Sequence, residues 1–344
     1  SRMKFSSLRL LRRPSCLGPW LLALPFLLII ALHYLTSHHG YADVIEADTR
    51  LAEVEVRSGY PICDCNEVKH LLIVYSPPEN FKEREEFRKA YTSPQMQKKY
   101  SYCAYFITGS TELSDEDTQL KEESEEHGDL IIGKFEDTDV NLNMKGLFWL
   151  RYVKDYCTST KLIVKMDDDV AFNVKGLVHR LARLPAYSSS IYGHVWSFTA
   201  VERKSGEKTY VPRSVYPFET YPNYTSGVAY VATRDAVASI ISLVDEKKML
   251  KTYNQIDDVV ITGILAERAG VQRINMPKWI GFCSDSRESL RQGDVLFSRL
   301  VDIDDRSKIR EYTDNLPKSL FQDSIEQTRW KLNTPPDCLT ESTD

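Results

Sequence analysis

Short apolar runs alternate with longer amphipathic stretches along the chain from about residue 68. The apolar runs predict strands, which we place at Val68–Tyr75, Tyr102–Thr108, Asp129–Gly133, Leu162–Val164, Ser190–Tyr192, Lys208–Pro212 and Val228–Thr233. The amphipathic stretches predict helices, which we place at Phe81–Tyr91, Asp115–Glu126, Asn143–Tyr156, Lys175–Leu184 and Ile256–Ala269. Strands alternating with helices at this spacing predict an α/β fold with a doubly wound, mostly parallel sheet.

Near the N-terminus, residues 17–35 form an apolar run whose only strongly polar member is His33. This run is just long enough to span a bilayer. The segment before it carries basic residues and no acid, so the positive-inside rule leaves the N-terminus in the cytosol. We therefore predict a cytoplasmic tail at 1–16, a single transmembrane signal-anchor at 17–35 and a polar stem at 36–62. A cleaved signal peptide is the alternative.

The remaining residues are enough for one large domain with a substantial core, which we place at 63–290. We expect residues 291–344 to form a helical C-terminal extension, and no pattern in them points to chemistry. The net charge of -5 argues against nucleic acid as a partner, because no basic stretch beyond the N-terminus could follow phosphates.

Seven cysteines are too few for a disulfide scaffold of this length, but they fit an oxidising compartment with a few bridges. The Cys-x-Cys pair has poor spacing for zinc and no second Cys/His pair nearby. The candidates for disulfides, whose pairing the sequence leaves open, are Cys63, Cys65, Cys103, Cys157, Cys283 and Cys338.

Three adjacent acids, Asp167, Asp168 and Asp169, directly follow the apolar run Leu162–Val164. Ligands of open α/β sheets bind beyond the carboxyl ends of strands. Adjacent carboxylates repel one another, and hard oxygen ligands suit Mg²⁺ or Mn²⁺, so the triplet suggests a metal site at a strand end. A solvated acidic turn is the simpler alternative.

Two further segments could serve either chemistry or structure. Asp257 and Asp258 open a predicted helix, where they could act chemically or simply cap the helix. The aromatic stretch Tyr216–Gly227 could stack on sugar rings or pack the domain, and it contains a glycosylation sequon at Asn223. The chain has no Gly-x-Gly-x-x-Gly after the first strand, no P-loop and no Gly-x-Ser-x-Gly elbow.

Taken together, these landmarks resemble the Fringe-like β1,3-glycosyltransferase family, which includes β1,3-galactosyl- and β1,3-N-acetylglucosaminyltransferases. The resemblance covers about residues 68–283, and its specificity comes from the order of several weak blocks. The seven blocks are Arg84-x3-Arg88-Lys-Ala-Tyr91, Tyr105-Phe-Ile-Thr-Gly109, Glu123-x3-His-Gly-Asp129, Phe135-Glu-Asp-x3-Asn-Leu-x-Met-Lys145, Lys165-x-Asp-Asp-Asp169, Tyr221-Pro-x-Tyr-x-Ser-Gly227 and Asp257-Asp-Val259.

The resemblance implies a GT-A catalytic domain that uses a UDP-sugar donor and inverts the anomeric configuration. Asp169 and Asp167 would hold Mn²⁺ or Mg²⁺, and Asp258 would be the catalytic base. The residues expected to bind the UDP-sugar are Arg84, Arg88, Lys145, Asp167 and Asp168.

The chain departs from the family pattern at three places. Tyr91 replaces a tryptophan, and Asp257 replaces a glutamate beside the expected base. Family members can offer a histidine to the metal downstream, and the matching region Pro277–Cys283 has none. An aspartate or water would then complete the metal's ligands, or dependence on the metal would be weaker.

We therefore expect a type II Golgi membrane protein that transfers a hexose, with galactose favoured, to a glycoprotein or glycolipid glycan in β1,3 linkage. A UDP-N-acetylhexosamine donor is the nearest alternative. A non-catalytic luminal lectin or transferase partner and a metal-dependent phosphoesterase are the others. Dimerisation with a second copy is left open.

Overall fold

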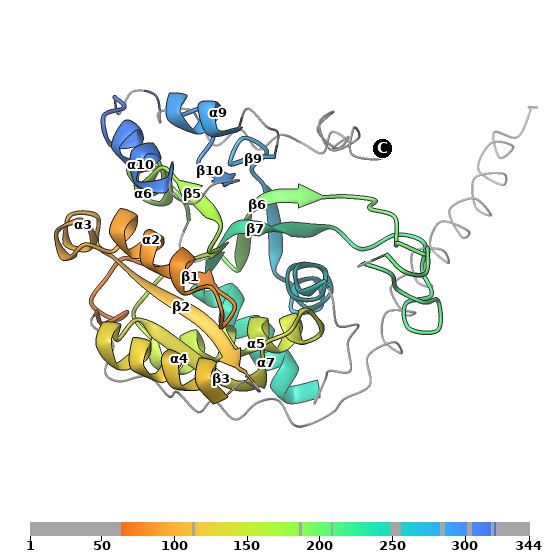
Figure 1. The fold of residues 1–344 in the computed structure, drawn as a ribbon. Coiled ribbons are helices and arrows are strands. Elements are labelled where there is room, and N and C mark those ends of the chain that lie inside the picture. The colour runs from red at the N-terminus through yellow and green to blue at the C-terminus, as the bar shows by residue number, and fades with distance from the viewer. Residues whose placement is uncertain are drawn as a thin grey trace, which may run out of the picture. The chain divides into compact units, whose positions relative to one another are not determined.

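Seven strands form the central sheet in the order β3-β2-β1-β4-β7-β6-β8 (Figure 1). This computed structural model describes residues 63–111, 114–185, 188–207, 209–247, 256–282, 286–300, 305–317 and 320. The strands of the central sheet are β1 (His70–Tyr75), β2 (Tyr102–Ser110), β3 (Leu130–Glu136), β4 (Leu162–Asp167), β6 (Ser190–Trp196), β7 (Tyr224–Thr233) and β8 (Gln272–Asn275). A three-stranded sheet has the order β5 (Val170–Phe172), β10 (Phe297–Arg299), β9 (Ile280–Gly281).

The central sheet is mixed. β1, β2, β3 and β4 pair in parallel, and so do β6 and β8. β7 runs antiparallel to both of its neighbours, β4 and β6. The prediction of a mostly parallel α/β sheet is therefore confirmed, and the reversal at β7 is the part that periodicity alone did not show.

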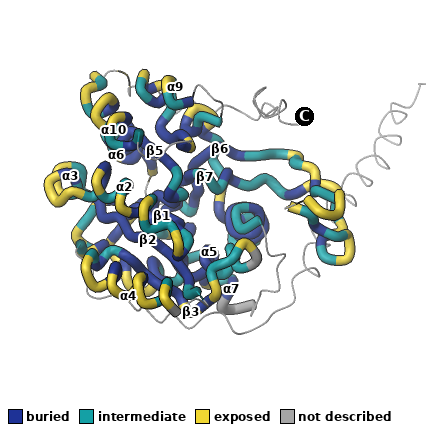
Figure 2. Tube along the Cα trace, in the orientation of Figure 1, coloured by how far each residue is buried: buried dark blue, intermediate teal, exposed yellow. Residues whose placement is uncertain are grey.

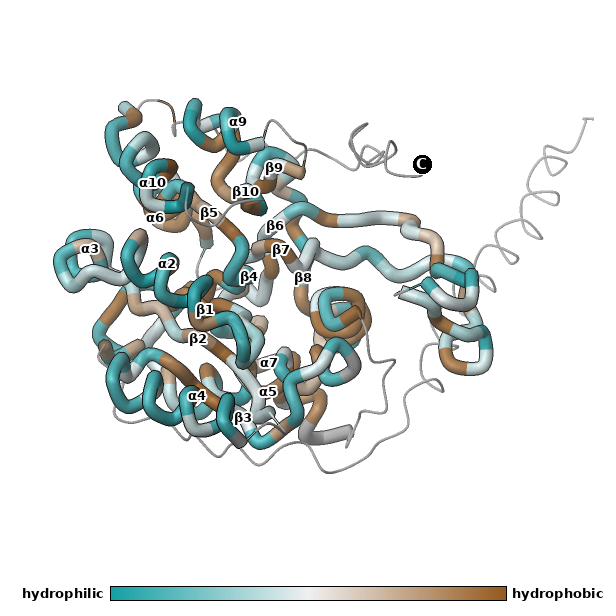
Figure 3. The backbone as a smooth tube through the Cα atoms, in the orientation of Figure 1, coloured by the Kyte–Doolittle hydropathy of each residue, from teal (hydrophilic) through white to brown (hydrophobic). Residues whose placement is uncertain are grey.

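Helices pack on both faces of the central sheet. The helices are α2 (Phe81–Tyr91), α3 (Pro94–Tyr100), α4 (Ser114–His127), α5 (Leu142–Tyr156), α6 (Val174–Leu181), α7 (Arg234–Lys247), α8 (Ala266–Arg268), α9 (Ser286–Gln292) and α10 (Arg306–Asp314), with a 3-10 turn η1 (Asp139–Asn141) and a π-helix η2 (Val259–Leu265). Helices α9 and α10 pack against the three-stranded sheet. Figure 2 shows buried positions along the strands and exposed positions on the outer sides of α3 and α4. Figure 3 shows the matching pattern in hydropathy, with hydrophilic residues along α2 and α4.

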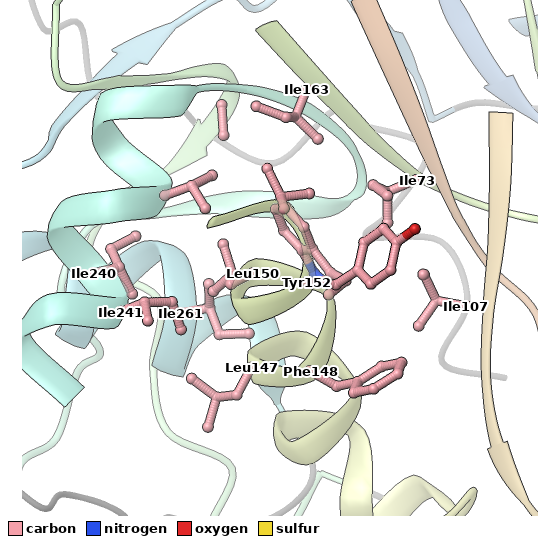
Figure 4. Packing of buried hydrophobic residues seen from close by; sticks show 14 of the residues in the cluster. Ile73, Ile107, Leu147, Phe148, Leu150, Tyr152, Ile163, Ile240, Ile241 and Ile261 are labelled. Carbon is pink, nitrogen blue, oxygen red and sulfur yellow. The ribbon is translucent and has the colours of Figure 1, made fainter. Parts of the chain in front are cut away.

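Successive side chains of β1 point to opposite faces of the sheet and so belong to two separate hydrophobic cores. Ile73 packs with residues of α5, α7 and η2, whereas Val74 packs with residues of α2, α3, α4 and α6. Figure 4 shows the first core, where Leu147 of α5 lies near Ile241 of α7 and Ile261 of η2. Burial on both faces explains why β1 reads as a continuous apolar run.

Most predicted elements are confirmed, with boundary changes of a few residues. The strand predicted at Lys208–Pro212 is wrong, because described residues 209–212 are not in a strand. The Arg203 guanidinium donates to the carbonyls of Val211, Tyr216 and Phe218. These carbonyls therefore accept hydrogen bonds from a side chain rather than from a partner strand. The prediction missed α3, α7, β5, β8, β9, β10 and α9.

Two disulfides link the start of the described chain to the sheet and to α5. Cys63 bonds to Cys103 of β2, and Cys65 bonds to Cys157 just after α5. Four of the six candidate cysteines are thus paired, whereas Cys283 and Cys338 lie outside the described residues. The predicted tail, anchor and stem also lie outside them. Among the described residues, none of the helices has the length and apolar character needed to cross a membrane.

The described part of residues 291–344 is closely packed with the rest of the domain. It contains strand β10 as well as helix α10, and β10 pairs antiparallel with β5 and parallel with β9. Ile309 of α10 is fully buried with Ala171, Leu290 and Leu300. This segment therefore reaches the acid-bearing turn between β4 and β5.

Replacing Ile309 by valine should lower the free energy of unfolding by about 1 kcal/mol, because one methylene is removed from a closely packed site. Urea unfolding of the full chain measures this change. Tyr312→Phe is the matched control on the same helix, because the Tyr312 side chain is exposed and should tolerate the loss of its hydroxyl. An unchanged midpoint for Ile309→Val would show that α10 does not pack as described.

Candidate active site

The three adjacent acids lie where β4 turns into β5, and their side chains separate. Asp167 and Asp169 keep 28% and 32% of their side chains exposed, whereas Asp168 is 5% exposed. Asp168 accepts hydrogen bonds from Ser76 Oγ at 2.7 Å and Asn80 Nδ2 at 2.9 Å. Burial raises the pKa of Asp168 to about 6. Asp168 therefore fastens the segment after β1 to the acid turn and leaves Asp167 and Asp169 accessible.

A pocket of about 640 Å³ brings these acids together with Asp257, Asp258 and Lys145. Among the residues that the structure describes, eight carboxylates and three cationic side chains line it. A nucleoside diphosphate carries further negative charge, and an excess of acids would repel it. The pocket therefore needs additional positive charge before it can accept such a ligand.

Asp258 lies at the start of the helical segment that continues as η2. Its Oδ1 accepts from Val259 N at 2.9 Å, and its Oδ2 accepts from Gly227 N at 3.0 Å. A Cβ at position 227 would lie 3.3 Å from Asp258 Oδ2, so glycine permits this close approach. Desolvation raises the pKa of Asp258 to about 7, Asp257 adds to the rise, and Lys165 opposes it. A carboxylate with this pKa can accept a proton near neutral pH.

The π-helix η2 positions Asp258 against β7. Thr262 Oγ1 donates to the Asp258 carbonyl and accepts from Thr225 N at 2.8 Å. π-Helical turns are rare and occur often at functional sites. Here the wide turn fixes the Asp258 carboxylate relative to the strand that carries Gly227.

The aromatic loop before β7 mainly packs the domain. Tyr216 and Tyr221 are buried, and their ring centroids lie 5.3 Å apart. Desolvation by burial and then the charge of Asp258 raise the pKa of the Tyr224 hydroxyl. Asn223 is half-buried, and its glycosylation stays a prediction.

Two buried lysines stabilise the pocket wall. Lys165 Nζ lies 2.7 Å from Asp167 Oδ1 and donates to the Gly227 carbonyl, also at 2.7 Å. Burial alone would lower the pKa of Lys165, but Asp167 and Asp257 outweigh it and raise that pKa. Lys145 Nζ lies 2.7 Å from Asp137 Oδ2. Each lysine therefore neutralises one carboxylate of the pocket.

Arg84 and Arg88, both expected to contact the donor, do not line this pocket. Arg84 is fully buried, pairs with Glu123 at 2.7 Å and donates to the carbonyl of Pro77. Arg88 pairs with Glu123 and Asp129 and lines a different cavity. Arg84 therefore holds the segment that carries Ser76 in place.

Two arginines of the C-terminal segment, which sequence reasoning did not single out, reach the acid turn. Arg299 of β10 places Nε and Nη2 each 3.0 Å from Asp169 Oδ2. Arg306 of α10 is fully buried and donates to the carbonyls of Asp168 and Glu83. Both lie more than 125 residues from the acids, and neither stands in a recognisable motif, so no local signal could have identified them.

Asp167 and Asp169 fit a divalent cation. Asp169 Oδ1 is buried and has no hydrogen-bond partner, which leaves an acceptor at the pocket that a cation would satisfy. Within the described ranges, no group of three His, Cys, Asp or Glu side chains could hold a metal ion. The two acids would therefore share the ion with oxygens of water or of a bound phosphate.

A family model described as galactosyltransferase matches residues 82–277, more than half of the chain. The chain belongs to this family, and this match confirms the resemblance seen in the sequence. The chain is 33% identical over 217 residues to "Lactosylceramide 1,3-N-acetyl-beta-D-glucosaminyltransferase" of Xenopus tropicalis. The aligned region covers 61% of this chain and 56% of that protein.

Two human proteins are also similar. "UDP-GalNAc:beta-1,3-N-acetylgalactosaminyltransferase 1" is 28% identical, covering 73% of this chain and 77% of that protein. "Beta-1,3-galactosyltransferase 5" is 26% identical, covering 62% of this chain and 67% of that protein. The matched region spans just over half the length of the first curated relatives.

Among solved structures, a glycosyltransferase involved in glycosylation of the PBCV-1 major capsid aligns with 72% of this chain and 99% of its own. The TM-score is 0.37 and the identity 12%.

Proposed function

We propose that this chain is an inverting, metal-dependent glycosyltransferase that moves a sugar from a UDP-sugar to a hydroxyl of an acceptor glycan in β1,3 linkage. The observation that carries the proposal is that the accessible acids Asp167 and Asp169 share one pocket with Asp258. The first two suit a metal-bound diphosphate, and the third suits proton removal. Family membership supports the same reading.

Asp258 would act as the single base. Its two backbone hydrogen bonds hold the carboxylate in place, so the acceptor hydroxyl meets a fixed partner rather than a mobile side chain. It would take the proton as the acceptor oxygen attacks the anomeric carbon and the bond to UDP breaks. Attack in one step on an α-linked donor gives a β-linked product.

Asp167 and Asp169 would orient the donor through the bound ion. When bound, a divalent ion such as Mn²⁺ or Mg²⁺ would neutralise the charge that develops on the leaving UDP. Lys165 pairs with Asp167 and holds it in place, and Lys145 does the same for Asp137 in the pocket wall.

The rate should depend on pH through Asp258. Its pKa is raised to about 7, so below that pH the carboxyl group is protonated and cannot accept the acceptor's proton. We expect kcat/KM to fall by about tenfold per pH unit below 7 and to level off above it. Initial rates between pH 5 and 9 measure this, with UDP binding followed over the same range as a control. A flat profile down to pH 5 would rule out Asp258 as the base.

The relatives do not agree on which sugar is transferred, because their names include N-acetylglucosamine, N-acetylgalactosamine and galactose. We would mix the purified full chain with Mn²⁺ and each UDP-sugar in turn, galactose first, and follow UDP release. The acceptors would be glycans ending in galactose, glucose or N-acetylglucosamine. Acceptor-dependent release identifies the donor and supports transfer. Release without any acceptor dependence would favour phosphoester or donor hydrolysis, and donor binding without turnover would favour a lectin-like role.

We also propose a type II Golgi membrane location with the catalytic domain in the lumen. The apolar run at 17–35 with its basic flank supports an anchor. The two disulfides at Cys63 and Cys65 support an oxidising compartment. Protease protection of the domain in sealed microsomes would test this, and digestion without detergent would contradict it.

A further inference from the structure

Arg299 is placed at the acid turn by the small sheet. It is the last residue of β10 and lies opposite Val170 in the antiparallel pairing with β5. The next residue, Leu300, donates its backbone N–H to the Asp169 carbonyl at 2.8 Å. Backbone contacts thus fix the start of the Arg299 side chain beside Asp169, and Arg299 lines the pocket.

The three cations that line the pocket differ in how free they are to change partner. Lys145 and Lys165 have 2% and 3% of their side chains exposed, and each pairs with a pocket carboxylate. Moving either lysine would leave a buried ammonium group without its carboxylate partner. Arg299 has 61% of its side chain exposed, and an exposed ion pair is weak. Arg299 is therefore the pocket cation that can change partner at small cost.

Arg299 and a divalent cation would compete for the same carboxylate. The guanidinium contacts Asp169 Oδ2 through both Nε and Nη2, while the neighbouring Oδ1 is the oxygen without a partner. A metal ion on Asp169 would repel the guanidinium beside it. The guanidinium would then need a new anionic partner, and its planar fork matches phosphate oxygens.

We propose that Arg299 is a donor-binding residue that leaves Asp169 when the metal binds and then contacts the diphosphate of the nucleotide. This inference rests on the proposed function, because it takes a metal-bound nucleoside diphosphate as the ligand. It assigns a role in the pocket to the C-terminal segment. The metal and the nucleotide should then bind cooperatively. The metal takes Asp169 away from Arg299, and the nucleotide gives the same arginine a new anionic partner.

The test measures two affinities of the full chain by calorimetry, that for Mn²⁺ alone and that for UDP at saturating Mn²⁺. For Arg299→Met, we expect UDP to bind about tenfold more weakly, because a charge-assisted contact is lost. Mn²⁺ alone should bind as tightly as before or more tightly, because its competitor for Asp169 is gone. Arg299→Lys should recover part of the UDP affinity.

Arg287→Met is the matched control, because Arg287 pairs with Asp305 and does not line the pocket. It should change neither affinity. If Arg299→Met weakens Mn²⁺ and UDP equally, Arg299 only orients Asp169 and the inference is overturned. Unchanged UDP binding in Arg299→Met overturns it as well. If the unmodified chain binds no UDP with Mn²⁺, the proposed function itself fails, and the inference fails with it.

Discussion

Asp258→Asn should lower kcat by about 10³-fold and leave UDP-sugar binding nearly unchanged. The amide has nearly the shape of the carboxylate but cannot take the acceptor's proton, and removal of a general base costs in this range. The amide nitrogen also cannot accept a hydrogen bond, so one of the two backbone contacts is lost. Binding should persist because the acids proposed to hold the metal, Asp167 and Asp169, lie on the β4–β5 turn, in a different element from Asp258. Initial rates, together with a calorimetric titration of the donor, measure both quantities.

The matched control is Asp235→Asn. Asp235 is also an aspartate in the first turn of a helix, α7, but it is exposed and lies outside the pocket. It should keep the full rate. Full activity in Asp258→Asn would remove the base from the proposed mechanism, whereas loss of donor binding would mean that Asp258 acts mainly by shaping the pocket.

Arg84→Ala should lower the free energy of unfolding by about 3 kcal/mol, because the mostly buried carboxylate of Glu123 loses its bidentate partner and keeps only its contact with Arg88. The carbonyls of Pro77 and Pro78 lose their donors as well. Since Ser76 binds both Arg84 and Asp168, donor affinity should fall with stability. Urea unfolding of the full chain measures the stability change.

Two further variants separate a positioning role from direct donor contact. Arg84→Lys keeps the charge but loses the fork, so its stability should lie between those of the alanine variant and the unmodified chain. Lys89→Ala, on the exposed side of the same helix, should change stability little. If Arg84→Ala unfolds as the unmodified chain does but binds UDP poorly, Arg84 contacts the donor directly and the positioning role is wrong.

Periodicity and motif order were sufficient to predict much of the domain. The strand that ends at Asp167 and the helix Phe81–Tyr91 follow from local apolar patterns, because burial imposes a period of two or of 3.6 residues. The shared pocket of Asp169 and Asp258 followed from the family resemblance alone, since the two lie in separate elements.

Long-range pairing explains what the sequence did not show. β7 looks like any other buried strand, and only its neighbours determine that it runs antiparallel to them. Arg84 was expected at the donor, but its distant partner Glu123 draws it into the core. Arg299 approaches Asp169 only because β10 pairs with β5. In each case the deciding contact joins residues far apart in the chain.

The most direct test of the account is the anomeric configuration of the product. With the donor and acceptor that give acceptor-dependent UDP release, NMR of the purified product would show whether the new bond is α or β. A single displacement driven by Asp258 predicts a β-linked product from the α-linked UDP-sugar. An α-linked product would contradict the account, because retention needs a second step that one base in this pocket does not provide.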